Sequence, residues 1–140
     1  MTSRQELVTH SLVQTEEAGA ALGARLRIGN VVLLSGPLGA GKTAFARGLA
    51  VGLGCDTEGV SSPTFTIIQF YPGPLPLQHV DLYRLSPPEV DDLLLEELLD
   101  DAAMAVEWPE RWPHAPTDAI HVDITPIGET DRRITITDQR

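Results

Sequence analysis

The chain contains, at residues 31–43, the stretch VVLLSGPLGAGKT, in which four consecutive apolar residues run into a glycine-rich loop. Residues 36–43 match the phosphate-loop pattern G-x-x-x-x-G-K-[ST] at every fixed position. Apolar residues at helical spacing then predict a helix over 43–53, and Gly54 is a typical residue for its end. A buried strand, this loop and a helix, in that order, predict a nucleotide-phosphate site.

The residues of this loop predict how it would bind phosphates and Mg²⁺. Glycines allow backbone N–H groups to converge on a β-phosphate at the positive end of the following helix. Lys42 would bridge the β- and γ-phosphates, and the Thr43 hydroxyl would ligate Mg²⁺. Pro37 has no N–H to offer, but it lies early in the loop, so we expect it to stiffen the loop and not to disable it. The residues assigned to the triphosphate are Gly36, Gly39, Ala40, Gly41, Lys42 and Thr43.

Lys42 is also the only lysine of the chain, because the other nine cations are all arginines. Lysine is a compact point charge, which fits between terminal phosphates, whereas arginine is a wide planar fork. The absence of a second lysine argues against a guanine-specific switch, whose Asn-Lys-x-Asp motif needs one.

Composition narrows the class of protein. The 140 residues, 42% hydrophobic and with a formal net charge of −10, predict one P-loop NTPase domain over 1–140. The negative charge argues against autonomous binding of nucleic acid, which is mostly electrostatic. Cys55 is the single cysteine and excludes an internal disulfide. No segment has the apolar length of a signal peptide or a membrane span, so we expect a cytoplasmic protein without a membrane partner.

The remaining elements complete a fold prediction. We expect a first helix over 14–26, strands over 64–71, 75–83 and 102–106, and a terminal antiparallel pair over 119–125 and 132–137. An acidic amphipathic helix should begin at Pro87-Pro88 and bury Val90, Leu93, Leu94, Leu98 and Leu99. This order predicts a three-layer α/β fold of the P-loop NTPase type. Its central sheet should be mostly parallel with antiparallel additions, and helices should cover both faces.

Two acidic residues follow strand-like runs and could hold a magnesium shell or an attacking water. Glu107 ends the apolar run 102–106, and Asp81 follows the more mixed run 77–80. The residues alone do not separate their roles. His79 beside Asp81 lacks a third ligand at metal spacing, which favours a hydrogen-bonding histidine over a metal ligand.

Two further segments have a functional and a structural interpretation. Residues 61–66 follow the loop's helix and could reach over a γ-phosphate as a switch, or could be a hydroxyl-rich turn. Residues 107–112 place Trp108 and Trp112 beside the candidate acid, either as a wall of the site or a partner surface, or as packing.

Four motifs together resemble the bacterial TsaE (YjeE) family, the small ATPases of tRNA threonylcarbamoyladenosine synthesis. They are residues 38–43, 62–66, 79–85 and 107–110, and they occur in the family's order and at similar spacing. The resemblance spans roughly residues 15–111.

The resemblance implies a role for each matching residue. Lys42 and the loop would bind ATP, Thr43 with Glu107 would hold Mg²⁺, and Asp81 would support hydrolysis. Trp108 would line the site. The switch would consist of Ser62, Pro63 and Thr64, and the adenine would lie near Thr15 and the pair Arg132 and Arg133. The family usually has aspartate where this chain has Pro37, so no role of that carboxylate carries over.

The resemblance also implies partners. Family members are weak ATPases alone and act with TsaD and TsaB, so this chain would contact tRNA only indirectly. A small-molecule kinase is an alternative, but it usually needs an arginine-bearing lid, and Arg84 is the only arginine over 59–88. A nucleotide-dependent binding module with vestigial hydrolysis also stays open.

Overall fold

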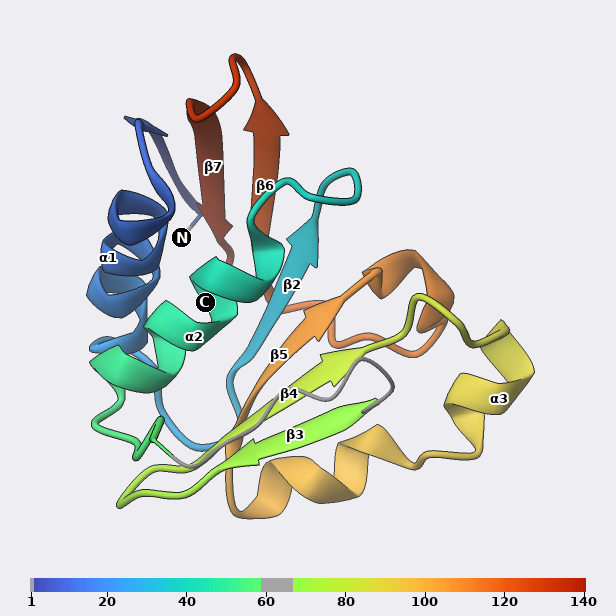
Figure 1. Ribbon diagram of the computed structural model, residues 1–140. Coiled ribbons are helices and arrows are strands. Elements are labelled where there is room, and N and C mark those ends of the chain that lie inside the picture. The colour runs from blue at the N-terminus through green and yellow to red at the C-terminus, as the bar shows by residue number, and fades with distance from the viewer. Residues whose placement is uncertain (1, 59–66) are drawn as a thin grey trace.

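Seven strands form one sheet in the computed structural model, which describes residues 2–58 and 67–140 (Figure 1). The strands are β1 (Ser3–Thr9), β2 (Val31–Ser35), β3 (Ile68–Tyr71), β4 (Leu77–Asp81), β5 (Ala103–Glu107), β6 (Ile120–Pro126) and β7 (Arg132–Asp138). The helices are α1 (Leu12–Gly23), α2 (Lys42–Gly52) and α3 (Pro87–Asp91), with 3₁₀ turns η1 (Leu95–Asp100) and η2 (Pro109–Arg111). Across the sheet the order is β1-β7-β6-β2-β5-β4-β3.

The centre of the sheet is parallel. β2 pairs with β5 and β6, and β4 pairs with β5, all in parallel, whereas β7, β1 and β3 add antiparallel ladders at the two sides. The carboxyl ends of the four parallel strands therefore meet at one edge. In open α/β sheets this edge is where ligands bind, and the glycine-rich loop leaves β2 there (Figure 1).

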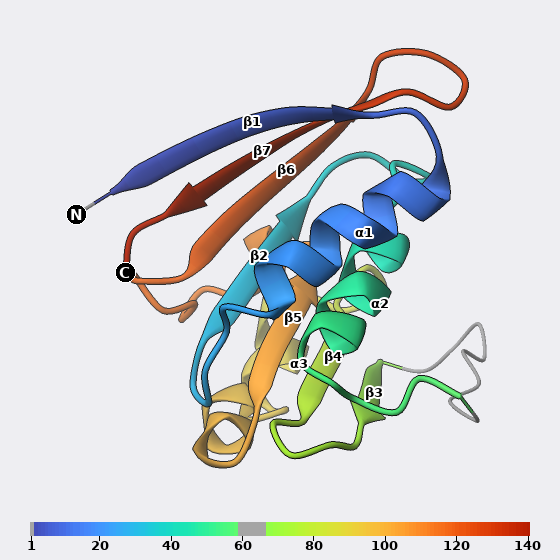
Figure 2. The same ribbon diagram turned by 90° about the vertical axis from the view of Figure 1, so that its left-hand side faces the viewer.

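Helices cover both faces, as the sequence predicted. α1 and α2 lie side by side on one face, and α3 and η1 lie on the other (Figure 2). The four apolar residues that open β2 alternate between the two cores, because successive strand side chains point to opposite faces. Val32 and Leu34 pack under α1 and α2, whereas Val31 and Leu33 pack with Val90 and Leu95. The three-layer α/β prediction is confirmed.

Glycines bring α1 and α2 into close contact. A Cβ added to Gly48 of α2 would collide with the carbonyl oxygen of Glu16, and one added to Gly19 of α1 would collide with that of Phe45. The two helices therefore pack backbone against backbone. This contact fixes α2, whose first residues belong to the phosphate loop motif.

The prediction of one continuous helix through Leu99 was wrong. The helix stops at Asp91, and Leu94 adopts a left-handed conformation with φ 51° before the 3₁₀ turn η1 begins. This turn of the chain exposes Leu94 by 53% and buries Leu95 instead. Left-handed backbone costs about 1–2 kcal/mol for such a residue, and burial of the Leu95 side chain offsets a similar amount.

The N-terminal segment also differs from the prediction. Ser3–Thr9 forms the edge strand β1 and pairs with β7 along its whole length. α1 begins earlier than predicted, at Leu12, because the Ser11 side chain accepts a hydrogen bond from the backbone N–H of Gln14.

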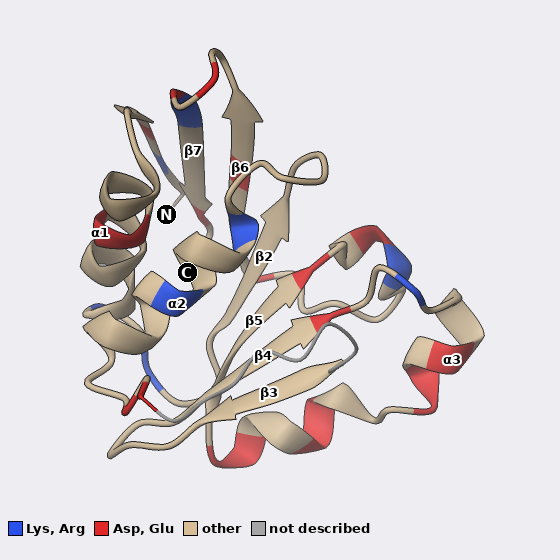
Figure 3. Ribbon diagram, in the orientation of Figure 1, with Lys and Arg blue, Asp and Glu red and all other residues tan. Residues whose placement is uncertain are grey.

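Acidic side chains gather on α3 and η1, on the face away from α1 and α2 (Figure 3). They are exposed and form a solvated face: Glu89, Asp91, Asp92, Glu96, Glu97 and Asp100. Within the described ranges, no helix has the length and apolarity needed to cross a bilayer.

Candidate functional site

The phosphate loop joins β2 to α2 through three glycines with positive φ. Gly36 (φ 153°), Gly39 (φ 77°) and Gly41 (φ 106°) adopt backbone conformations that side chains disfavour. A Cβ on Gly36 would also collide with the carbonyl oxygen of Ile124 in β6. Gly41 is the N-cap of α2, and no side chain caps that end. The start of α2 therefore offers backbone N–H groups to an anion.

Pro37 takes part in the turn of this loop. Its carbonyl oxygen accepts a hydrogen bond from the N–H of Ala40 at 3.1 Å. Proline lacks only the donor, so this carbonyl contact remains available to it.

Lys42 is buried at the centre of the site, with 4% of its surface exposed. Its ammonium donates to the carbonyl oxygen of Gly36 at 2.7 Å and lies 3.6 Å from the centroid of a Trp108 ring. Burial lowers the pKa of Lys42, and the nearby carboxylates of Glu107 and Asp81 oppose that shift. The ammonium is thus partly desolvated and held by neighbours that a phosphate could replace.

Glu107 is buried at the end of β5 and is tied to the loop's helix. Its Oε2 atom accepts the Thr43 hydroxyl at 3.1 Å and lies 2.6 Å from Nε2 of His79. Asp81 ends the neighbouring strand, directly opposite Glu107 in the parallel register, and is half-buried. The Asp81 carboxylate accepts the backbone N–H of Tyr83 at 3.0 Å. Two carboxylates thus lie side by side at the carboxyl edge of the sheet.

A cavity of about 570 Å³ opens onto these groups. Lys42, Thr43, Asp81, Glu107 and Trp108 all line it, so the structure brings together these five residues chosen from the sequence. Sequence reasoning missed other residues of the wall: Leu12, Glu16, Leu38, Arg47 and Tyr83. Arg47 could have been predicted from the sequence. It follows Thr43 by four residues, and such positions share one face of a helix.

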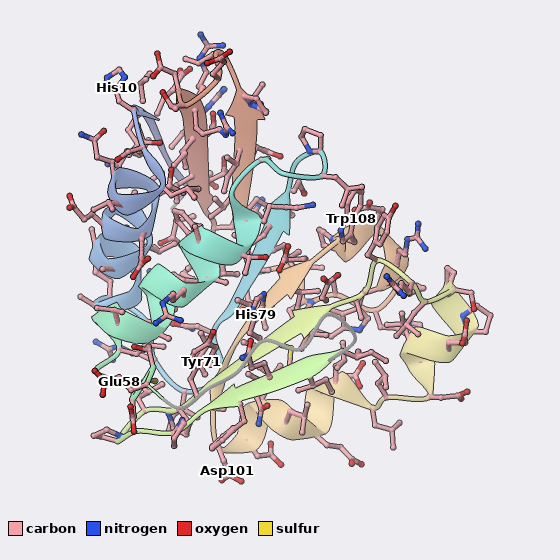
Figure 4. The ribbon with its side chains drawn as sticks, in the orientation of Figure 1. His10, Glu58, Tyr71, His79, Asp101 and Trp108 are labelled. Carbon is pink, nitrogen blue, oxygen red and sulfur yellow. The ribbon has the colours of Figure 1, made fainter. Side chains whose placement is uncertain are left out.

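The two tryptophans have different environments. Trp108, labelled in Figure 4, follows β5 and has φ 61°. The centroid of its ring lies 5.0 Å from that of the Tyr83 ring. Trp112 is buried in the core on the opposite face of the sheet. Arg111 lies in the loop between the two tryptophans. Its guanidinium donates to the carbonyl oxygen of Leu85 at 2.9 Å and fixes that loop. Only Trp108 is therefore available to the site.

Of the three residues assigned to the adenine, Thr15 and Arg132 lie against the phosphate loop. Thr15 is fully buried, its hydroxyl lies 2.8 Å from that of Thr9, and its methyl group lies 3.5 Å from where a Cβ on Gly41 would be. Thr15 therefore supports the loop from behind. Arg132 donates to the carbonyl oxygens of Ala40 at 2.9 Å and Gly39 at 3.4 Å.

Arg133, in contrast, makes its ion pair with Glu6 on β1 at 3.2 Å. Strand alternation explains the difference, because Arg132 shares a face with the buried Ile134 and Arg133 points to the other face. Arg132 is thus the member of the pair that contacts the phosphate loop. Ser62, Pro63 and Thr64 lie outside the described residues, and their switch role stays a prediction.

The donor set suits a magnesium nucleotide. Mg²⁺ prefers oxygen ligands and usually takes one or two from the protein, with the rest from phosphates and water. Thr43, Glu107 and Asp81 offer hydroxyl and carboxylate oxygens at one edge. Within residues 2–58 and 67–140, no three His, Cys, Asp or Glu side chains are grouped to hold a metal by themselves. The hydroxyl and carboxylate oxygens at this edge fit a cation that takes its other ligands from phosphate and water.

Comparison with known proteins identifies relatives over most of the chain. The family model "Threonylcarbamoyl adenosine biosynthesis protein TsaE" matches residues 9–134. A Nostoc protein of that name is 45% identical over 130 residues, which cover 88% of this chain and 79% of the relative. Its Treponema pallidum counterpart is 38% identical and covers 92% and 97%. The crystal structure of Bacillus subtilis YdiB superposes with a TM-score of 0.81 at 32% identity, covering 100% of this chain and 88% of that one.

Proposed function

The chain belongs to the TsaE family of tRNA threonylcarbamoyladenosine biosynthesis proteins, and on that premise we propose that it is the ATP-binding and ATP-hydrolysing subunit of this modification. One observation carries the proposal. Lys42 and Thr43 open α2 directly beside Glu107, with the Thr43 hydroxyl 3.1 Å from its carboxylate. This arrangement joins a phosphate-binding helix end to an acid at the carboxyl edge of the sheet.

Backbone amides of residues 39–43 would bind the β-phosphate, because the uncapped N-terminus of α2 concentrates positive potential there. The Lys42 ammonium would exchange the Gly36 carbonyl for phosphate oxygens between the β and γ positions. Arg132 would hold the loop in shape through its hydrogen bonds to Ala40 and Gly39.

The two acids differ in burial, and we assign their roles on that basis. Thr43 donates its hydroxyl proton to Glu107, which leaves the hydroxyl lone pairs for a cation. We therefore assign Thr43 and Glu107 to the Mg²⁺ site, where the bound ion would neutralise phosphate charge. Asp81 is half-buried and lines the cavity, and its carboxylate accepts the backbone N–H of Tyr83 in its own loop. We assign Asp81 to the orientation of the attacking water.

Activity would be slow in the isolated chain and would rise with the partner proteins TsaD and TsaB. Trp108 covers the Lys42 ammonium, so productive binding requires its indole to move. The net charge of −10 supports a division of labour in which the partners contact the tRNA.

The proposal is tested by measuring phosphate release from ATP by the purified chain, with and without TsaB and TsaD. We expect slow Mg²⁺-dependent hydrolysis that the partners accelerate, and no hydrolysis by Lys42→Ala. Unchanged hydrolysis with the partners, together with transfer of the γ-phosphate to a metabolite, would instead identify a small-molecule kinase.

A further inference from the structure

We propose that His79 is a positioning residue, whose imidazole holds the Glu107 carboxylate in the orientation that supports Mg²⁺ beside Thr43. The inference rests on the proposed function and adds to it a residue that never touches the nucleotide. His79 lies in the middle of β4 and does not line the cavity of the site. It therefore acts only through Glu107.

The strand register brings the two side chains together. His79 lies opposite Ala105 of β5, and Glu107 follows two residues later on the same face of that strand. The methyl side chain of Ala105 leaves room for the imidazole to cross toward Glu107. The resulting contact, from Nε2 of His79 to Oε2 of Glu107, measures 2.6 Å and is buried.

Burial makes this contact costly to break. His79 is 6% exposed and Glu107 is 4% exposed, so neither side chain can exchange its partner for bulk water at low cost. A buried carboxylate needs donors, and the imidazole satisfies that need when Nε2 carries the proton. Two contacts therefore hold the Glu107 side chain, one from His79 on β4 and one from Thr43 on α2.

Both donors use the same oxygen of Glu107. Thr43 and His79 each contact Oε2, and within the described part of the chain no hydrogen bond is made to Oε1. Among the described residues, both contacts are made to Oε2, so Oε1 is the oxygen that we assign to a cation or to water bound to it. Without the His79 bond, the Glu107 carboxylate could rotate. It would then present Oε1 to the cation in only some of its orientations.

Partners that orient a metal-binding side chain typically affect metal affinity by about 10–100-fold when removed. We expect this loss to fall on the metal and not on the phosphates, because His79 does not contact the phosphate loop in the hydrogen bonds described. A histidine that merely filled space would give the opposite pattern, with nucleotide and metal affinity falling together as the fold loosens.

The experiment compares His79→Leu, which removes the donor, with His79→Gln, whose amide N–H can occupy the place of Nε2. Mn²⁺ serves as a paramagnetic probe of the magnesium site, and its binding to the full chain with the β,γ-imido analogue of ATP is followed by electron paramagnetic resonance. Affinity for the analogue without metal is measured by calorimetry. We expect His79→Leu to lose about 10–100-fold in Mn²⁺ affinity and to keep its metal-free affinity. His79→Gln should stay near wild type.

His79→Asn keeps the polarity but is too short to place a donor at the Nε2 position, and it replaces His79→Leu if that variant fails to fold. A second measurement tests the route of action: in a Glu107→Gln background, removal of His79 should cause no further loss of Mn²⁺ affinity. Equal Mn²⁺ affinity in wild type and His79→Leu, or His79→Asn, would overturn the positioning role and leave the proposed function standing. Failure of the wild-type chain to bind the analogue at all would overturn both.

Discussion

The ammonium of Lys42 lies 3.6 Å from the centroid of a Trp108 ring while it donates to the carbonyl oxygen of Gly36. A cation against an indole face is attracted by about 0.5–2 kcal/mol, with the larger values in desolvated sites. In the proposed function, the indole therefore covers the group that a phosphate would have to reach. The proposed function therefore predicts that the position of Trp108 changes when the phosphate loop is occupied.

Trp108 should report nucleotide binding through its fluorescence. Addition of ATP should change the emission because the phosphate displaces the indole from Lys42. Trp112→Phe is the matched control: Trp112 is buried on the other face of the sheet, so this variant should keep the full response. A response that survives in Trp108→Phe would contradict the coupling between Trp108 and Lys42.

The two acids should separate in their kinetic effects. Glu107→Gln should weaken the Mg²⁺ dependence of nucleotide affinity by about 10–100-fold. Asp81→Asn should bind Mg²⁺ and ATP normally but hydrolyse ATP about 10²-fold more slowly. Nucleotide affinity titrated against Mg²⁺, and single-turnover hydrolysis, separate the two effects. The same Mg²⁺ response in Glu107→Gln and wild type would remove Glu107 from the metal site.

Triphosphate affinity should fall at high pH earlier than an ordinary lysine would predict. Burial lowers the pKa of Lys42 below 10.5, and only its protonated form attracts phosphate. Affinity is therefore constant below the lowered pKa and decreases as pH rises through it. Calorimetry between about pH 7 and 10.5 measures this. Lys42→Arg should bind more weakly but show no alkaline decrease, since a guanidinium keeps its charge.

The contact between α1 and α2 should tolerate no side chain at Gly48. A Cβ there would meet the backbone of Glu16 and Ala20, which can yield only if the helices separate. We expect Gly48→Ala to destabilise the chain by about 1–3 kcal/mol in chemical denaturation. Gly128→Ala is the control, because its Cβ would lie 3.5 Å from the side chain of Asp131, an ordinary contact. Equal stability of Gly48→Ala and wild type would show that the helices adapt.

Local features of the chain were predictable from its sequence. The phosphate loop was found because the spacing of its glycines and lysine determines its local structure without help from distant contacts. Glu107 and Asp81 were found because each follows a strand-like run, apolar before Glu107 and more mixed before Asp81. The core positions of β2 followed from its uninterrupted apolar residues, as expected for a strand buried on both faces.

Features that depend on distant partners were missed. The mostly exposed residues of β1 carry little periodic pattern, and this strand forms because β7 offers a complete edge. The bond between His79 and Glu107 depends on the register of β4 against β5, which no local pattern determines. Leu94 breaks a regular helical pattern because burial of Leu95 decides the path of the chain. One missed feature could have been predicted locally. Strand alternation places Arg132 on the same face as the apolar Ile134 and Arg133 on the opposite face.

The central claim is that the loop, Lys42 and Thr43 form a site for a magnesium triphosphate. Calorimetric titration of wild type and Lys42→Ala with the β,γ-imido analogue of ATP and Mg²⁺ tests it most directly. We predict one binding site per wild-type chain, and a loss of at least about 100-fold in Lys42→Ala, the effect of removing a charge-assisted contact of roughly 3 kcal/mol. Equal affinity in the two proteins, or no binding by the wild-type chain, would contradict the account.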